Sequence, residues 1–178
     1  AAAMVVLESS WGKAQIRDLI VRQANQYLTA TLAIGRIEGS FLRGIELHDV
    51  QLVRDGRALV RIDTVIAGYT IRELVTGGTT VRALTLTRPV IVAGRLPDGG
   101  WDLGALIRRD SAKPRGSGPR RPIHLPLVEI VDGAVTLRDP LSFGIARLPT
   151  GYRALNLQFS IDSDPGGWRL SFRRGSFI

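Results

Sequence analysis

The chain has 178 residues, no cysteine, and a net charge of +8 with a pI of about 11.1. This length is sufficient for one domain with a hydrophobic core, and the missing cysteines exclude a disulfide framework or a thiolate metal site. The basic surplus favours an anionic partner, either nucleic acid or acidic lipid headgroups.

The first nine residues are mostly apolar but too few to cross a bilayer, which takes about 20 residues. No charged segment precedes them, as it would in a signal peptide. Residues 1–9 are therefore interpreted either as a free N-terminus or as the end of a membrane anchor.

A helix is expected next, because Ser9 and Ser10 are good N-caps and apolar residues follow at helical spacing to about residue 28. One interpretation is a basic amphipathic helix that rests on an anionic membrane. The preferred one is a helix packed on the first strands, because a sheet that continues in one direction needs a cap at its other end. The membrane-proximal residues in the first interpretation are Lys13, Arg17 and Arg22.

Apolar and polar residues alternate over 32–38 and 45–54, which predicts two half-buried strands. Gly39 and Gly44 tolerate positive φ and place a turn or bulge between them. Asp55-Gly56 then predicts a tight hairpin.

The rest of the chain is also expected to be mainly strands. Pro89 should lie at an edge or a bulge, because it has no N–H for a ladder. Asp132-Gly133 predicts a turn, and Asp102 is expected to cap a short helix. The predicted strands are 57–67, 81–95, 123–131, 134–138, 153–161 and 168–173, and the predicted short helices are 70–76 and 101–109.

Residues 111–122 are rich in Pro, Gly and Arg and are interpreted as a flexible basic linker. Residues 10–110 then form a helix-capped β-region, and residues 123–178 continue the sheet. The chain stops in apparent strand, so a truncated C-terminus is expected.

A weak repeat supports stacked β units. Leu47, Leu86 and Ile130 each have another apolar residue five positions later. A Val, Pro or Gly lies three positions after each of them. Spacing of this kind favours β-hairpin units added one after another over a closed barrel.

No residue pattern supports catalysis, a cofactor or a metal. His48 and His124 lie in apolar strands, with no cysteine and no obvious carboxylate partner, so neither is expected to bind a metal. Nucleic-acid binding is a rival because of the charge. However, Trp168 and Phe172 alternate with arginines on one strand, which places rings and guanidinium groups on opposite faces and disfavours a stacking platform.

One segment carries a family resemblance. Residues 35–41 (GRIEGSF) and 44–50 (GIELHDV) resemble the N-terminal signature of TamB and its AsmA-like relatives, and the likeness extends over about residues 10–101. This resemblance implies a periplasmic protein anchored in the inner membrane of a diderm bacterium. It also implies a β-rich body that conducts phospholipids between the two membranes, and an outer-membrane TamA-like barrel that is reached through a region absent from this chain.

These arguments predict a mainly β protein. We expect an elongated, curved, antiparallel-rich sheet that forms an open, taco-like groove, with an N-terminal amphipathic helix and short connecting helices. Alternatives are a basic nucleic-acid-binding β-domain and a structural scaffold without a ligand. The residues expected to line the groove for acyl chains are Val60, Ile62, Ile66, Leu84, Leu86, Val90, Val92, Leu155, Leu157, Phe159, Ile161, Trp168, Leu170 and Phe172.

Overall fold

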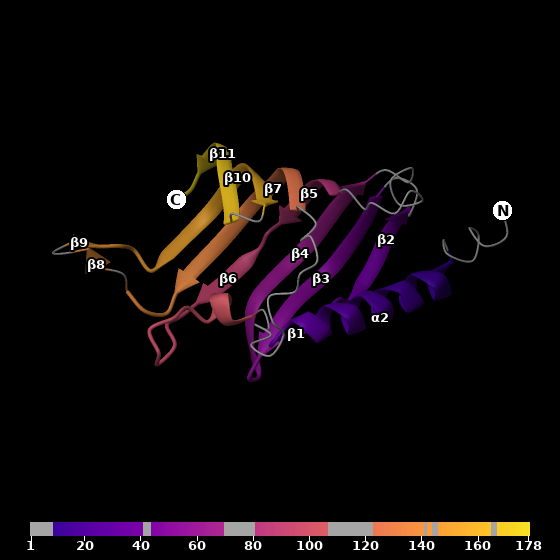
Figure 1. Ribbon diagram of the computed structural model, residues 1–178, viewed down its shortest axis with the longest axis horizontal. Helices are drawn as coiled ribbons and strands as arrows, with labels where there is room; N and C mark the ends of the chain where they lie inside the picture. Colours follow the sequence, from indigo (N-terminus) through magenta and orange to yellow (C-terminus); the bar gives the residue numbers. More distant parts are fainter. Residues whose placement is uncertain are drawn as a thin grey trace.

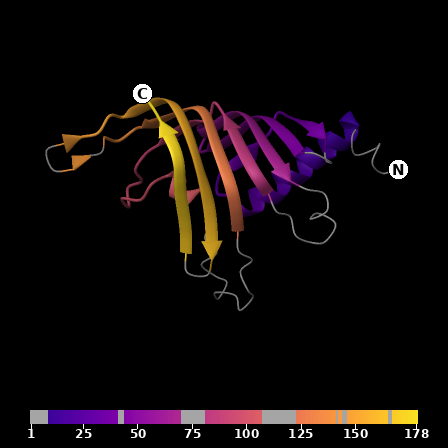
Figure 2. The same cartoon turned by 90° about the horizontal axis from the view of Figure 1, so that it is seen from above.

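The fold is one broad sheet with a helix at one end (Figure 1). Within the part of the chain that is described, nine strands join this sheet, which confirms the mainly β class. Figure 2 shows the strands bending along their length, so that the sheet forms an arch. The structure is a computed structural model that describes residues 9–40, 44–69, 81–106, 123–140, 142–143, 146–164 and 167–178.

Helix α2 (Ser10–Tyr27) begins where the sequence predicts, because the side chain of Ser9 accepts a hydrogen bond from the Gly12 N–H at 3.1 Å. Its apolar side packs onto the first strands. Asn25 joins the helix to the next strand, since its side-chain oxygen accepts a hydrogen bond from the Leu32 N–H at 2.6 Å. The expected packed helix is therefore confirmed. Helix α2 lies beside β1 (Thr31–Ala33) and β2 (Arg36–Ser40), at the opposite end of the sheet from β11 (Gly167–Ser176) (Figure 1).

The first half of the sheet is built from local hairpins. Gly39 and Gly44 have φ of 83° and 143°, and Asp55-Gly56 has φ of 51° and 72°, so both predicted turns use positive φ. Strands β1 and β2 lie end to end along the same side of β3, and β4 lies on the other side. The bounds are β1 (Thr31–Ala33), β2 (Arg36–Ser40), β3 (Gly44–Arg54) and β4 (Arg57–Tyr69).

The second half of the sheet begins with a parallel pairing. The predicted strand 81–95 is broken into two pieces that lie end to end between β4 and β7. Strand β7 pairs in parallel with both pieces, and parallel neighbours need a long crossover connection. The strands of this half are β5 (Val81–Thr87), β6 (Val90–Ala93), β7 (Ile123–Leu137), β10 (Gly151–Asp164) and β11 (Gly167–Ser176).

A line of left-handed residues, here called the seam, crosses the sheet at Asp49, Arg88, Asp132 and Ala154, with φ between 48° and 55°. Arg88 is level with Asp132 in the parallel ladder, and Ala154 lies beside Leu155, which pairs with Gly133. A left-handed residue within a strand shifts the alternation of side chains by one position. The seam therefore exchanges the two faces in the sequence pattern of β3, of the β5–β6 strand, of β7 and of β10. The intervening β4 makes the same exchange between Ile62 and Val65 without a left-handed residue.

One predicted feature, the turn, is wrong for this reason, and the position predicted at an edge or a bulge takes the second of those two forms. Asp132-Gly133 is not a turn, because β7 continues through it as one strand. Pro89 is not at an edge, since it lies buried in the central break between β5 and β6, where its carbonyl accepts a hydrogen bond from the Ala134 N–H at 2.7 Å. For Pro89, the predicted alternative of a bulge within the strand is therefore the one observed.

A short 3-10 helix, η1 (Leu103–Ala105), lies within the segment 101–109, where one helical turn is predicted. Residues 107–109 of that segment lie outside the described residues. Asp102 does not cap η1. Its buried carboxylate instead accepts a hydrogen bond from the Gly94 N–H at 2.9 Å and pairs with Arg138. The predicted helix at 70–76 and the linker at 111–122 lie outside the described residues, and a small separate hairpin is formed by β8 (Ser142–Phe143) and β9 (Ala146–Arg147).

Candidate functional site: the apolar face of the sheet

Apolar side chains lie in register across the sheet on both sides of the seam. Residues paired in a ladder project to the same face, so each row of pairs marks one face. Together these rows are called the apolar face. On one side of the seam they are Leu47, Val65, Leu86, Ile130 and Leu157, and then Ile45, Ala67, Leu84, Val128, Phe159 and Phe172; on the other side they are Leu32, Leu52, Val60, Ile91 and Val135.

Helix α2 covers one end of this face, called the covered end. Ile16, Ile20 and Val21 of the helix pack against a core of four residues that are 6–8% exposed. This core joins residues from both sides of the seam into one cluster, which shows that the shifted alternation keeps both on the same face. The four residues are Ile34, Ile37, Val50 and Val65.

No helix or strand of the described residues lies over the other end, called the uncovered end, which is formed by β10 and β11. Leu170 is 52% exposed and Phe172 is 68% exposed, although both pair with apolar residues of β10. The ring of Phe172 lies 5.6 Å from that of Phe159, centroid to centroid. Neighbouring apolar side chains that stay exposed on a sheet can mark a binding surface.

The structure brings most of the predicted groove residues together. Ile161 and Leu170 are paired, and so are Phe159 and Phe172, which places β10 and β11 residues on the same face. Trp168 pairs with Ser163 at the start of β11. The predicted residues that share the apolar face are Val60, Ile62, Leu84, Leu86, Leu155, Leu157, Phe159, Ile161, Leu170 and Phe172.

Three predicted groove residues lie on the other face, because strict period-two counting ignores the seam. Ile66 pairs with Glu46 and Thr85 and is 38% exposed. Val90 pairs with Arg61 and is 42% exposed. Val92 pairs with Thr136 and, two positions after Val90, also falls outside the apolar rows.

The apolar face also includes residues that the prediction did not select, among them Val65, Val128 and Ile91. The sequence did contain a signal for them. The repeated +5 spacing of Leu47, Leu86 and Ile130 is the distance from one side of the seam to the other, since Leu86 pairs with Ile130 and Ile91 with Val135. Residues of one strand that are an odd number of positions apart normally point to opposite faces. For residues five positions apart to share a face, the alternation of side chains must shift by one between them.

The predicted membrane-proximal cations have different surroundings. Arg17 donates to the Gly35 carbonyl at 3.0 Å and pairs with Asp18 at 2.9 Å, so it helps to attach the helix to the sheet. Lys13 is partly exposed and Arg22 is exposed. Trp11 and Leu19 of the same helix are 64% and 50% exposed.

The polar face opposite is lined by ion pairs and amides. Gln158 donates to Glu129 at 2.8 Å, and Arg88 pairs across the seam with Asp63 at 2.6 Å. On β11, Arg174 pairs in register with Gln158 on this face, while Phe172 lies on the apolar one. The two faces of the uncovered end therefore differ sharply in character.

No helix of the described residues is both long and apolar enough to cross a bilayer. No protein-family model, curated protein or solved structure matches this chain.

Proposed function

We propose that the apolar face binds the acyl chains of phospholipids and carries them along the sheet. The observation that supports this is the row from Leu47 to Leu157, which begins beneath α2 and continues onto an end of the sheet that nothing described covers. This row stays apolar beyond the core that α2 covers. An acyl chain that slides along it therefore meets one similar site after another.

The energetics of this proposal require no chemical step. Each buried CH₂ group contributes about 0.8 kcal/mol, so a two-chain lipid gains much of what it loses on leaving a bilayer. Headgroups stay in water at the margin of the sheet. Movement from one row to the next exchanges one aliphatic contact for another, and the groove expected from the sequence is the shape that this function needs.

The wider role follows from the family resemblance and forms part of the proposal. In it, the chain belongs to an inner-membrane-anchored periplasmic protein of the TamB and AsmA-like kind, and it supports outer-membrane biogenesis by conducting phospholipids. The arginine surplus then faces anionic headgroups rather than nucleic acid.

The direct test measures the phospholipid that co-purifies with the chain. Phe172→Arg places a charge on the uncovered end of the apolar face, and we expect it to lower the lipid recovered by organic extraction and mass spectrometry. The matched control is Val131→Arg, because Val131 is also apolar and exposed (37%) but lies on the polar face. Equal loss from both variants, or a wild-type chain without lipid, contradicts the proposal and favours a scaffold.

A further inference from the structure

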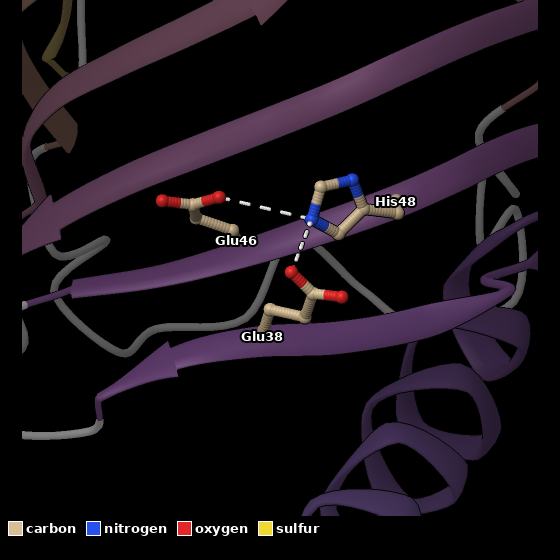
Figure 3. A group of neighbouring side chains, drawn as sticks. All are labelled: Glu38, Glu46 and His48. Atoms are coloured by element: carbon tan, nitrogen blue, oxygen red, sulfur yellow. Dashed lines mark ion pairs between the residues drawn. The ribbon is translucent and has the colours of Figure 1, made fainter.

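A histidine and two glutamates converge on the polar face at the covered end of the sheet (Figure 3). Glu46 and His48 are two positions apart on β3 and therefore project to the same face. Glu38 of β2 lies directly opposite Glu46 in the ladder. Like charges in directly opposed positions are unfavourable, so this pairing calls for a positive partner between them.

One nitrogen of the His48 imidazole lies close to both glutamates. His48 Nε2 lies 3.4 Å from Glu38 Oε2 and 3.7 Å from Glu46 Oε2. Both separations exceed the usual length of an N–H···O bond, about 2.7–3.2 Å. Nε2 is also buried and makes no hydrogen bond to any described residue, which leaves a buried polar atom unsatisfied.

The other ring nitrogen is held in place. His48 Nδ1 lies 3.2 Å from the Thr64 hydroxyl on the neighbouring strand β4. With the proton on Nδ1, this contact directs the Nε2 lone pair at the two carboxylates. Histidine ligands of metal ions are commonly oriented by a hydrogen bond made through the other ring nitrogen.

We propose that Glu38, Glu46 and His48 bind a divalent transition-metal ion, with Zn²⁺ as the best fit. Zn–N and Zn–O bonds of about 2.0–2.1 Å in a tetrahedron place neighbouring ligand atoms roughly 3.3–3.4 Å apart, close to the two separations observed. One imidazole with two carboxylates suits Zn²⁺, whereas an all-oxygen set suits Mg²⁺ or Ca²⁺. The fourth position is left for water.

The surroundings prepare Glu38 for this role. Arg36 Nε donates to Glu38 Oε1 at 2.7 Å, which leaves Oε2 directed at His48. A carboxylate must be deprotonated to ligate a metal, and the hydrogen bond from the Arg36 guanidinium is made to that charged form. The sequence-based expectation of no metal site rested on a missing carboxylate partner, and that premise is wrong: the E-L-H spacing on a strand that pairs with Glu38 was the signal.

The test is titration of the intact chain with Zn²⁺ alone and with Co²⁺ as a spectroscopic probe. We expect one ion per chain, visible Co²⁺ d–d bands with imidazole nitrogen in the coordination sphere, and displacement of Co²⁺ by Zn²⁺ but not by excess Mg²⁺ or Ca²⁺. His48→Ala and Glu46→Gln should each weaken binding at least about tenfold, and Thr64→Val should weaken it by about tenfold.

Two matched controls identify the site. His124 pairs with a single carboxylate, that of Asp162, so His124→Ala removes a histidine–carboxylate pair without the second glutamate. Glu129→Gln removes a carboxylate from the same face. Both should leave Zn²⁺ affinity unchanged, and circular dichroism reports whether each variant is folded. Absence of binding, as expected if His48 is simply a cation held by two glutamates, overturns the proposal, as does undiminished binding by a folded Glu46→Gln variant.

Discussion

The two ends of the apolar face have the same backbone pattern but different cover. At the covered end, Val65 is 7% exposed beneath α2, whereas at the uncovered end Phe172 is 68% exposed. Val128, which lies between them in the sheet, is still only 2% exposed. Val128 does not belong to the cluster beneath α2 and is nevertheless buried, so α2 is one source of cover but not the only one. Apolar character alone therefore does not determine whether a residue is core. The difference teaches that one sheet face can be packed core at one end and exposed at the other.

The largest expected effect comes from placing the same charge at both ends of one row. Val65→Arg buries an unpaired charge, and we expect it to cost about 3–5 kcal/mol, which lowers the melting temperature by roughly 10 °C at about 2–4 °C per kcal/mol. Leu157→Arg should cost at most about 1 kcal/mol, because its head group reaches water from a half-buried position. Thermal melts followed by circular dichroism compare them, and an equal loss would mean that the uncovered end is also packed core.

A smaller effect tests whether the seam is needed at both ends. A Cβ at Gly35 would lie 2.9 Å from Asp49 Cβ, and one at Gly133 would lie 2.9 Å from Ile130 Cγ2. We expect Gly35→Ala and Gly133→Ala each to cost about 1–3 kcal/mol in chemical denaturation. Gly104→Ala is the control, since its Cβ meets nothing within 4 Å. If only Gly35→Ala destabilises the protein, the seam does not constrain the uncovered end.

The smallest effect separates electrostatics from packing at the covered end. The hydrogen bond from Arg36 holds the pKa of Glu38 below its ordinary value. A carboxylate with a lowered folded pKa adds stability above its unfolded pKa, and this is lost as the pH falls through the folded pKa. We expect Arg36→Gln to raise the pKa of Glu38, which NMR titration measures. The loss of stability at acid pH should become slightly smaller, and the change is small because the pair is exposed. An unchanged Glu38 titration would show that Arg36 does not act on it.

Much of the fold could be predicted from local patterns. Ser9 begins the helix, Asp55-Gly56 makes the hairpin, and the alternating residues of β10 lie on one face, because each depends on neighbours in sequence. The seam could not be predicted in this way. Asp49 and Asp132 are ordinary turn residues in isolation, and nothing in their own sequence shows that each adopts a left-handed φ within a paired strand. Ile66 and Val90 were therefore assigned to the wrong face.

The central claim is that the apolar face contacts acyl chains only where α2 leaves it open. The chain has no cysteine, so single labels at Phe172→Cys, Ser171→Cys and Val65→Cys are unambiguous. Each labelled chain is mixed with phospholipids that carry a quencher on the acyl chain. We predict strong quenching at position 172 and weak quenching at positions 171 and 65. Equal quenching at 171 and 172, or none at 172, would contradict the claim.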